Sequence, residues 1–518
     1  MRSDSLGNDW KQEIPIPVYE KNEDYISLYW RAWELAFLHL KEIPGMPQTP
    51  YMDEAFSSRY IWIWDTCFMS LFCKYSPTHF PGVESLQNFY ETFYDGKRLP
   101  DIVPDDDLGE SPKGVPTPLQ IHIFDNPPLF AWAEYLNILH TGNMERLNML
   151  LDKQYLQKHY EYLENLTEQK TIDQVMAPTC WRKQERGYFW EGGNSGMDNT
   201  PRGRTEIPCT VDRPNNPDML WIDAIAQQGL SALCISRLAK LAGDEALSSE
   251  WEMKYLEKKR IVNTYYYDEK DGYYYDIDFR NGDFMKVKTI ASFWVLESEM
   301  ASADQAEAMC RTLLDPELFG GIVPCVSLAR NDGDFVEDGR YWRGALWLPT
   351  AYMTIKSLEK YGKYDLAAEL SCRIVEHMSR TYFEYSPHTI WECYAPNVPE
   401  PSYGCDENIR RVRPDFCGWS AVGPICLFLE NVIGIHSVNA VTKAVHWNIP
   451  CGTEGKIGIR NFRVGKIRTD LLYDSGRCLI TSDGEYDLYV NDLLYHIHAG
   501  ENIFSVIKIE TAEEILKR

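Results

Sequence analysis

The segment Trp190-Glu-Gly-Gly-Asn-Ser-Gly-Met-Asp198-Asn-Thr-Pro-Arg202 separates two long stretches of helical pattern. Its three glycines, two asparagines and one proline break any regular hydrophobic periodicity, so we expect a loop. Functional side chains are often carried on loops that a rigid scaffold positions. A lone Asp198 would otherwise be a turn former or a helix cap. The places where the other unusual loops fall decide between these interpretations.

Helical periodicity recurs along most of the chain, with apolar residues at three- and four-residue steps. The first such segment forms one apolar stripe that we expect to face the core, made of Tyr25, Leu28, Tyr29, Ala32, Leu35 and Ala36. The pattern predicts about twelve helices, at roughly 22–42, 65–75, 82–95, 126–142, 144–168, 217–242, 247–267, 287–300, 302–314, 344–361, 365–382 and 419–432.

The connections between these segments alternate in kind. After every second helix they are short, and several contain a glycine that we expect to end a helix in the left-handed conformation: Gly82, Gly142, Gly243 and Gly362. The other connections are longer or chemically unusual, at 62–65, 120–128, 198–217, 286–289, 341–344, 391–396 and 418–419. This alternation predicts helical hairpins whose long loops gather at one end.

Six hairpins with one functional end describe a mainly α fold, the (α/α)6 toroid, in which an outer ring of helices surrounds an inner ring. The alternative is an irregular helical domain or a solenoid, but the chain has no fixed-period repeat. From about residue 437, β-branched and aromatic residues cluster between Gly, Asp and Asn turns, at 457–464, 479–481, 486–490 and 503–509. We therefore expect a helical domain over 1–436 and a small β-sandwich-like domain over 437–518.

Composition excludes several classes of partner. A net charge of −25 argues against nucleic acids and anionic membranes, since binding to polyanions depends on Lys and Arg. The chain has no run of 18 apolar residues and no signal-peptide pattern at its start, which predicts a cytoplasmic protein. Its 14 cysteines contain no Cys-x-x-Cys pair and are expected to be reduced thiols.

The motifs that remain are acids among tryptophans. The 11 histidines form no His-Glu-x-x-His motif and no Gly-x-Ser-x-Gly elbow occurs, so we expect neither a metal nor a cofactor. Hydrolysis of a glycosidic bond needs two carboxyl groups, one protonated and one ionised. Asp198 and Glu392 fit this requirement, because a ring of six hairpins places their loops across one central pit. Trp190 and Trp391 would supply apolar surroundings that raise a carboxyl pKa.

Four motifs carry a resemblance to a known family. Trp62-Ile-Trp-Asp65, the Asn194-Ser-Gly-Met-Asp198-Asn-Thr-Pro loop, Tyr341-Trp-Arg-Gly-Ala-Leu-Trp347 and Trp391-Glu392 resemble glycoside hydrolase family 63 and the related trehalases, over roughly residues 22–435. The resemblance implies an (α/α)6 fold, Asp198 as general acid, Glu392 as general base and inversion at the anomeric carbon. It also implies sugar contacts in the innermost subsite from Trp62, Trp64, Asp65, Trp342, Arg343 and Trp347.

The chain departs from the family pattern at two places. Thr200 stands where Ser is commoner, and Asp125-Asn126-Pro-Pro stands where relatives often have Gln-Pro-Pro. Asn126 keeps an amide for a sugar hydroxyl, with a shorter reach.

Several candidate residues have a structural alternative. Arg202 and Arg343 are either ion-pair partners or ligands of a sugar or carboxylate, and Asp65 is either a sugar contact or a helix cap. The remaining substrate-binding candidates are Trp190, Asn199, Trp391, Tyr394 and Trp419, of which Tyr394 and Trp419 are either contacts or walls of the pit.

The sequence thus predicts an inverting, exo-acting α-glycosidase. Its substrate would carry a terminal α-glucosyl or α-mannosyl unit, as in a disaccharide or a glycosyl-glycerate. The only partner expected is this small carbohydrate, and the oligomeric state is left open. One alternative is a sugar-binding protein that has lost turnover, against which the presence of both acids argues. A lyase or epimerase would need a His or Tyr base, where the motif loops offer acids.

Overall fold

The computed structural model describes residues 8–42, 46–55, 61–92, 99, 102–103, 127–166, 181–190, 192–203, 216–405, 410–453 and 455–506. The α-helices are α1 (Glu23–Leu38), α2 (Ile63–Cys73), α3 (Gly82–Thr92), α4 (Phe130–Thr141), α5 (Met144–Lys153), α6 (Tyr155–Asn165), α7 (Gly192–Ser195), α8 (Ile222–Leu241), α9 (Glu245–Tyr265), α10 (Trp294–Glu297), α11 (Ala303–Leu314), α12 (Leu348–Glu359) and α13 (Tyr364–Glu384). The 3-10 helices are η1 (Asn8–Gln12), η4 (Ile290–Phe293) and η5 (Ser420–Val422), and η6 (Gly423–Val432) is a π-helix.

The strands lie mainly at the C-terminal end of the chain. They form two larger sheets there, with the orders β1-β15-β16-β17-β20 and β13-β14-β18-β19. The bounds in these sheets are β1 (Ile16–Tyr19), β13 (Ser437–Asn439), β14 (Ala444–Trp447), β15 (Lys456–Val464), β16 (Ile467–Asp474), β17 (Arg477–Ser482), β18 (Tyr486–Val490), β19 (Leu493–Ile497) and β20 (Gly500–Ser505). The expectation of a mainly helical chain with a C-terminal β region is confirmed.

Short strands also lie among the loops of the helical part, where the sequence predicted none. One sheet has the order β12-β11-β8-β7-β6. Its strands are β6 (Arg182–Gln184), β7 (Gly187–Phe189), β8 (Met219–Leu220), β11 (Asp276–Asp278) and β12 (Phe284–Met285). Three two-stranded pairs are formed by β2 (Leu40–Lys41) with β3 (Tyr51–Met52), β4 (Ile61–Trp62) with β5 (Ile102–Val103), and β9 (Tyr267–Asp268) with β10 (Tyr273–Tyr274).

Each predicted helical segment corresponds to helix in the structure, with differences that have local causes. All six residues of the predicted stripe on α1 are buried. The segment expected as one helix over 144–168 is two helices, because Gln154 adopts a left-handed conformation (φ 58°) between α5 and α6. The segment at 287–300 contains only η4 and α10, and residues 419–432 form η5 followed by the π-helix rather than an α-helix.

The glycine predictions hold at three of four positions. Gly142, Gly243 and Gly362 have φ of 67°, 81° and 69°, the left-handed conformation that ends a helix. Gly82 is instead the first residue of α3. A Cβ added at Gly82 would lie 2.6 Å from Cβ of Cys73, so this glycine is needed for the close approach of α2 and α3.

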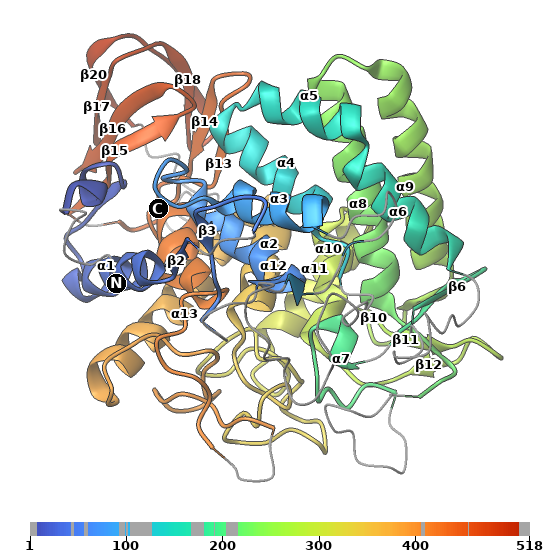
Figure 1. Ribbon diagram of the computed structural model, residues 1–518. Helices are drawn as coiled ribbons and strands as arrows, with labels where there is room; N and C mark the ends of the chain where they lie inside the picture. Colours follow the sequence, from blue (N-terminus) through green and yellow to red (C-terminus); the bar gives the residue numbers. More distant parts are fainter. Residues whose placement is uncertain are drawn as a thin grey trace, which may run out of the picture.

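Contacts between helices form a closed cycle. In chain order α2, α4, α8, α10, α12 and the η5–η6 segment each contact the next, and η5 and η6 contact α2 again. The helices α3, α9 and α13 pack against α2, α8 and η6, outside this cycle. Figure 1 shows α2, α4, α8, α10 and α12 in the middle of the molecule, with α9 at its edge. None of the helices in the described ranges has the length and hydropathy that crossing a membrane requires.

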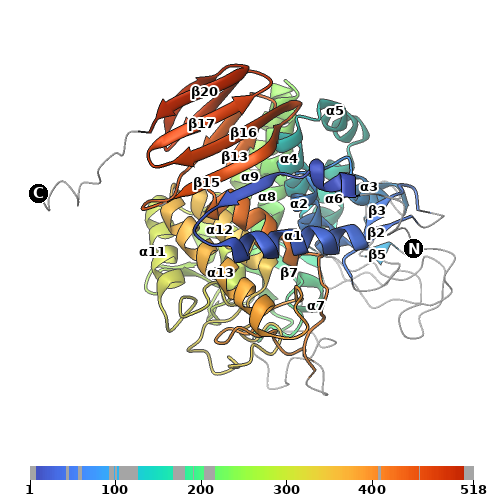
Figure 2. The same cartoon turned by 90° about the vertical axis from the view of Figure 1, so that its left-hand side faces the viewer.

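The two ends of the cycle differ. The segments between α11 and α12 and between α13 and η5 gather with α7 at the lower end in Figure 1, and the β region lies at the upper end. Figure 2 shows the larger sheet lying over the helices at that end. The N-terminal strand β1 pairs with β15, from Ile16↔Arg460 to Tyr19↔Ile457, so the start of the chain completes a C-terminal sheet. The boundary predicted at residue 436 remains a prediction.

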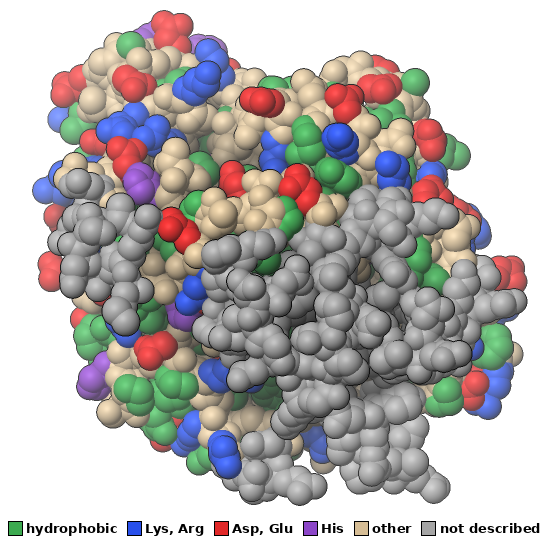
Figure 3. Space-filling view, in the orientation of Figure 1, with side chains coloured by type: hydrophobic (Ala, Val, Ile, Leu, Met, Phe, Trp, Pro, Cys, Tyr) green, Lys and Arg blue, Asp and Glu red, His purple; other side chains and the backbone are tan. Residues whose placement is uncertain are grey.

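Surface charge is mixed on the face seen in Figure 3. Lys and Arg side chains are interspersed with Asp and Glu over the described part of that face. The excess of acids is a property of the whole chain, at −25.

A buried carboxylate lies at the end of the cycle nearest the β region. Glu430 of η6 accepts hydrogen bonds on Oε1 from Lys74 Nζ (2.9 Å) and Tyr75 OH (2.8 Å). Its Oε2 accepts from Tyr352 OH (3.0 Å) and pairs with Lys356 Nζ at 2.9 Å. The two lysines hold the pKa of Glu430 well below its ordinary value, despite complete burial. This cluster fastens η6 to α12 and to the end of α2.

We predict that Glu430→Gln lowers the free energy of unfolding at pH 7 by about 3–5 kcal/mol, because it leaves the buried Lys74 without its counter-charge and Lys356 with Glu359 alone. A lowered carboxyl pKa contributes stability above the ordinary value of 4.5 and loses it as the pH falls below that value. The difference in free energy of unfolding between wild type and variant should therefore become smaller as the pH is lowered. Urea unfolding at pH 7 and pH 4 measures both effects. The control is Glu384→Gln, at an exposed pair with Arg380, whose unfolding midpoint should not move.

Candidate active site

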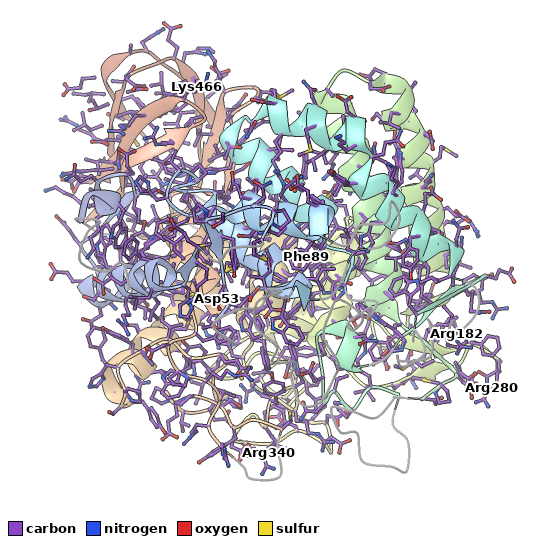
Figure 4. The ribbon with its side chains drawn as sticks, viewed as in Figure 1. Asp53, Phe89, Arg182, Arg280, Arg340 and Lys466 are labelled. Atoms are coloured by element: carbon purple, nitrogen blue, oxygen red, sulfur yellow. The ribbon has the colours of Figure 1, made fainter. Side chains whose placement is uncertain are left out.

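The base predicted from sequence lies on a segment held by backbone pairing. Glu392 N donates to Arg413 O (3.0 Å), and Leu346 and Tyr394 exchange two backbone hydrogen bonds of 2.9 and 3.0 Å. The loop of the Tyr341–Trp347 motif and the loop of Glu392 are therefore hydrogen-bonded neighbours. Both belong to the group of loops at the lower end of Figure 1, and Figure 4 labels Arg340 at this end.

Glu392 is 3% exposed, and three donors face its carboxyl group. Tyr341 OH donates to Oε1 (2.9 Å), the Arg413 backbone N–H donates to Oε2 (3.1 Å), and Arg413 Nη1 lies 3.6 Å from Oε1. Burial raises the pKa of Glu392, whereas Arg413 and Tyr341 lower it; the net direction is upward. A carboxyl with these opposed influences is suited to proton transfer near neutral pH.

Asp198 lies on the turn that follows α7 and is half-buried. Before it, Gly196 (φ 80°) packs on Trp64, since an added Cβ would lie 3.0 Å from the indole ring. After it, the amide of Asn199 donates to Arg340 O (3.0 Å) and accepts from the Trp342 N–H (2.8 Å). The Asp198 loop is thus fixed on one side to α2 and on the other to the Tyr341–Trp347 motif.

Asp65 is a third carboxyl group that faces both Asp198 and Glu392. It lies in the first turn of α2 and is 5% exposed. Burial is the main cause of its raised pKa, and the negative charges of Asp198 and Glu392 add to it. The same two carboxylates raise the pKa of Tyr341 after burial does. Trp64, the neighbour of Asp65, packs on Gly196 of the Asp198 loop and on Trp419, whose Nε1 donates to Glu392 O, so these contacts bring together the three segments that carry the carboxyl groups.

Tryptophans surround these carboxyls. Trp342 and Trp347 stack with ring centroids 4.1 Å apart, and Trp64 lies 6.2 Å from Trp342 and 5.6 Å from Trp419. Trp419 Nε1 donates to Glu392 O (2.8 Å), which ties this ring to the candidate base. Aromatic faces of this kind bind the apolar faces of sugars and lower the local dielectric. The arrangement is an acid-lined site with indole walls.

Comparison with known proteins agrees with this chemistry. The sequence profile of the mannosylglycerate hydrolase MGH1-like glycoside hydrolase domain matches residues 58–406. The chain belongs to this glycoside hydrolase family. The resemblance to family 63 and the trehalases that the sequence motifs indicated is confirmed.

The individual proteins that this glycoside hydrolase resembles share 19–27% of their residues with it over the aligned regions. An uncharacterized protein of Borreliella burgdorferi is 27% identical over 89% of this chain and 90% of its own length. The periplasmic trehalase of Citrobacter koseri is 24% identical over 64% of this chain, which spans only 60% of the trehalase. The solved GH63 mannosylglycerate hydrolase from Thermus thermophilus matches at a TM-score of 0.56 and 19% identity, over 77% of this chain and 99% of that one.

The structure favours the ion-pair interpretation for one arginine of the enzyme. Arg202 is 1% exposed. Its guanidinium donates to Asp223 (2.7 and 2.8 Å) and Asp276 (2.8 and 2.6 Å) and lies 4.2 Å from the Trp221 ring centroid. Trp190 packs edge-on against the same Trp221. The role of these residues that the contacts support is to hold the Asp198 loop on α8 and β11.

The structure describes the contacts of three other candidates, Tyr394, Arg343 and Trp62. Tyr394 OH accepts from the Trp391 N–H (3.1 Å), which fixes the turn that carries Glu392. Arg343 is partly exposed and lies 3.7 Å from Asp334, and Trp62 caps α2 without a side-chain capping bond. Asn126 lies outside the described residues. In the described ranges, no group of three or more His, Cys, Asp or Glu is arranged to hold a metal ion.

Two residues on Glu392 were not among the candidates named from sequence. Tyr341 lies in the Tyr341–Trp347 motif, from which Trp342, Arg343 and Trp347 were named as sugar contacts. Arg413 belongs to no motif, and only the pairing of Trp391 with Pro414 brings it to the base. The sequence therefore did not predict that Arg413 lies beside Glu392.

We predict that Arg413→Met and Tyr341→Phe each move the acidic limb of the pH–rate profile to higher pH, because each removes a group that lowers the pKa of Glu392. The measurement is kcat/KM against pH on the best glycoside substrate. Arg340→Met, at a nearby arginine that faces Asp338, is the control and should leave the limb in place. An unchanged limb in both test variants would contradict the role given to Glu392.

Proposed function

We propose that this glycoside hydrolase is an inverting, exo-acting α-glycosidase with Asp198 as general acid and Glu392 as general base. The observation that carries the proposal is the site itself. Glu392 is buried under Tyr341 and Arg413, and its charge and that of Asp198 act on the same two groups, Asp65 and Tyr341. Inverting hydrolysis needs such a pair of carboxyls facing one another across a sugar and a water molecule.

The surroundings of Glu392 fit the role of general base. Glu392 receives a phenol hydroxyl, a backbone N–H and a guanidinium, and all of these favour the ionised form that accepts a proton from water. Asp198 lies on the opposite loop, where it would donate its proton to the leaving oxygen. The glycosidic C–O bond breaks, the water oxygen bonds to the anomeric carbon, and the proton of the water passes to Glu392.

Exo action and a small substrate follow from the proposed architecture. The closed cycle of six helical elements supports an (α/α)6 toroid, with the site in a pit at one end of the inner ring. Trp64 Nε1 and Asp65 Oδ1 are buried and have no hydrogen-bond partner among the described residues, which suits them to sugar hydroxyls. Arg343 and Trp62 are proposed as further contacts. We also propose the domain division at residue 436.

The choice of glycosyl unit rests on the relatives. Their names include mannosylglycerate hydrolase and trehalase. We propose a terminal α-mannosyl or α-glucosyl unit on a small partner such as glycerate or a second sugar.

We predict that the enzyme hydrolyses at least one member of a panel of α-mannosyl-glycerate, α-glucosyl-glycerate, trehalose and other α-linked glucosides and mannosides. Proton NMR of the first minutes should show the β-anomer of the released sugar, because a carboxyl separation of about 6.5–9.5 Å leaves room for water between base and sugar. An initial α-anomer would mean double displacement and make Glu392 a nucleophile. Saturable sugar binding with no hydrolysis of any member would favour a sugar-binding protein.

We predict that Asp198→Asn and Glu392→Gln each lower kcat by at least ~10²-fold while sugar binding persists, because each removes one proton-transfer group and nearly keeps its shape. Single-turnover rates and calorimetric binding separate the two effects. Asp334→Asn, at an acid outside the carboxyl cluster, is the matched control. A near wild-type rate in either test variant would contradict that assignment.

A further inference from the structure

Glu54 is a fully buried carboxyl group directly behind the site. It follows β3 and is 0% exposed, and Figure 4 labels its neighbour Asp53 in the interior of the molecule. Glu54 Oε1 lies 2.8 Å from the Trp62 backbone nitrogen and 2.9 Å from Thr66 Oγ1. It therefore lies at the start of α2, the helix that carries Trp64 and Asp65.

Both hydrogen bonds of Glu54 end on the same oxygen. Oε1 accepts from the Trp62 N–H and from the Thr66 hydroxyl, whose oxygen also lies 2.7 Å from the Trp62 carbonyl oxygen. A hydroxyl has one hydrogen, so Thr66 divides it between Glu54 and the carbonyl, and of the two donors only the Trp62 N–H is unshared. One full donor and one shared hydrogen stabilise a buried carboxylate weakly, which favours the neutral form.

The charges that face Glu54 act in the same direction. Burial is the main cause of its raised pKa, followed by the negative charges of Asp65 and Asp53. Asp53 is paired with His39 Nδ1 (3.1 Å) and Lys41 Nζ (3.2 Å).

The further neighbours of Glu54 and Asp65 are mostly acidic. The Cys417 thiol also faces Asp53 and Glu54, with its own pKa raised mainly by burial. Asp65 faces Asp198, Glu392 and Arg413 and stands within the first turn of α2. The partial positive charge of a helix N-terminus stabilises one carboxylate there, and two like charges sharing one site do not both ionise.

The second oxygen of Glu54 supports the same conclusion. Oε2 is buried and has no hydrogen-bond partner among the described residues. An ionised carboxylate with one unsolvated oxygen is expensive to bury, and a neutral carboxyl much less so. A Cβ added at Gly418 would lie 2.8 Å from the Glu54 carbonyl oxygen and 3.1 Å from its Cβ. Glu54 thus also contacts the segment that leads into Trp419.

We propose that Glu54 is a neutral carboxylic acid at pH 7 and a positioning residue for two walls of the site, the Trp62–Asp65 turn and the Gly418–Trp419 segment. Through its hydrogen bonds to Trp62 and Thr66 it fixes the first turn of α2, and by staying neutral it adds no negative charge beside Asp65. The positioning role rests on the proposed glycosidase function, and the protonation does not.

Glu54→Gln tests the protonation without any substrate. The amide is permanently neutral, and its oxygen in the place of Oε1 accepts from the Trp62 N–H and the Thr66 hydroxyl, so the variant should fold. A raised carboxyl pKa costs stability as the pH rises above the ordinary value of 4.5. The Tm of Glu54→Gln minus that of wild type should therefore increase between about pH 5 and pH 9. Infrared spectra at pH 7 should lose one protonated-carboxyl band in the variant.

The opposite results would overturn the proposal. An ionised Glu54 predicts a Tm difference that falls as the pH rises, an unchanged infrared band, or a Gln variant that does not fold. Glu245→Gln, at an exposed residue in the first turn of α9, is the matched control and should leave the band and the pH dependence as in wild type. These readouts remain decisive even if no glycoside is hydrolysed.

Activity tests the positioning role. Glu54→Gln should keep kcat/KM within about 3-fold of wild type, whereas Glu54→Ala should lose at least ~10-fold, because a small displacement of site walls is costly to orientation. Equal losses in the two variants would mean that the carboxyl itself takes part in the chemistry. Full activity in both would remove the positioning role.

Discussion

The four hydrogen bonds and ion pairs on Glu430 are the constraint on which the helical part depends. A carboxylate this deeply buried is stable only if its donors come from all sides, and here they come from α12 and from the residues after α2. The helical elements that contact one another in a cycle are thereby fixed at the end nearest the β region. At this end every charge of the cluster finds a partner.

The other end of the cycle has the opposite electrostatics. Asp65, Glu392 and Glu54 are also buried, but their pKa values are raised rather than lowered, because burial outweighs the few donors and, at Asp65 and Glu54, like charges add to it. An excess of acids over cations in an apolar site costs stability. Perturbed carboxyls cluster where proton transfer is carried out. The paired charges at one end provide the rigidity that lets the other end hold carboxyl groups of raised pKa.

Connections between distant segments give the site its shape. Asn199 joins the acid loop to the Tyr341–Trp347 motif, and Trp419 joins the base to the indole wall. Gly196 and Gly418 allow two of these contacts, because a side chain at either position would collide with Trp64 or Glu54. The loops are long, but backbone and amide hydrogen bonds hold them to one another.

The sequence by itself determined the helical segments, the C-terminal strands, the family and the acids of the motifs, because periodicity and short motifs are local properties of a chain. The pairing of β1 with β15 was decided by tertiary structure, since it depends on a distant partner, and hydrophobic periodicity did not indicate the break at Gln154 or the π-helix η6. The same holds for Arg413 on Glu392, for the burial of Arg202 between two aspartates and for Glu54 behind Asp65. Local sequence carries the identity of a side chain; which charges and hydrogen-bond partners surround it is fixed only when the chain is folded.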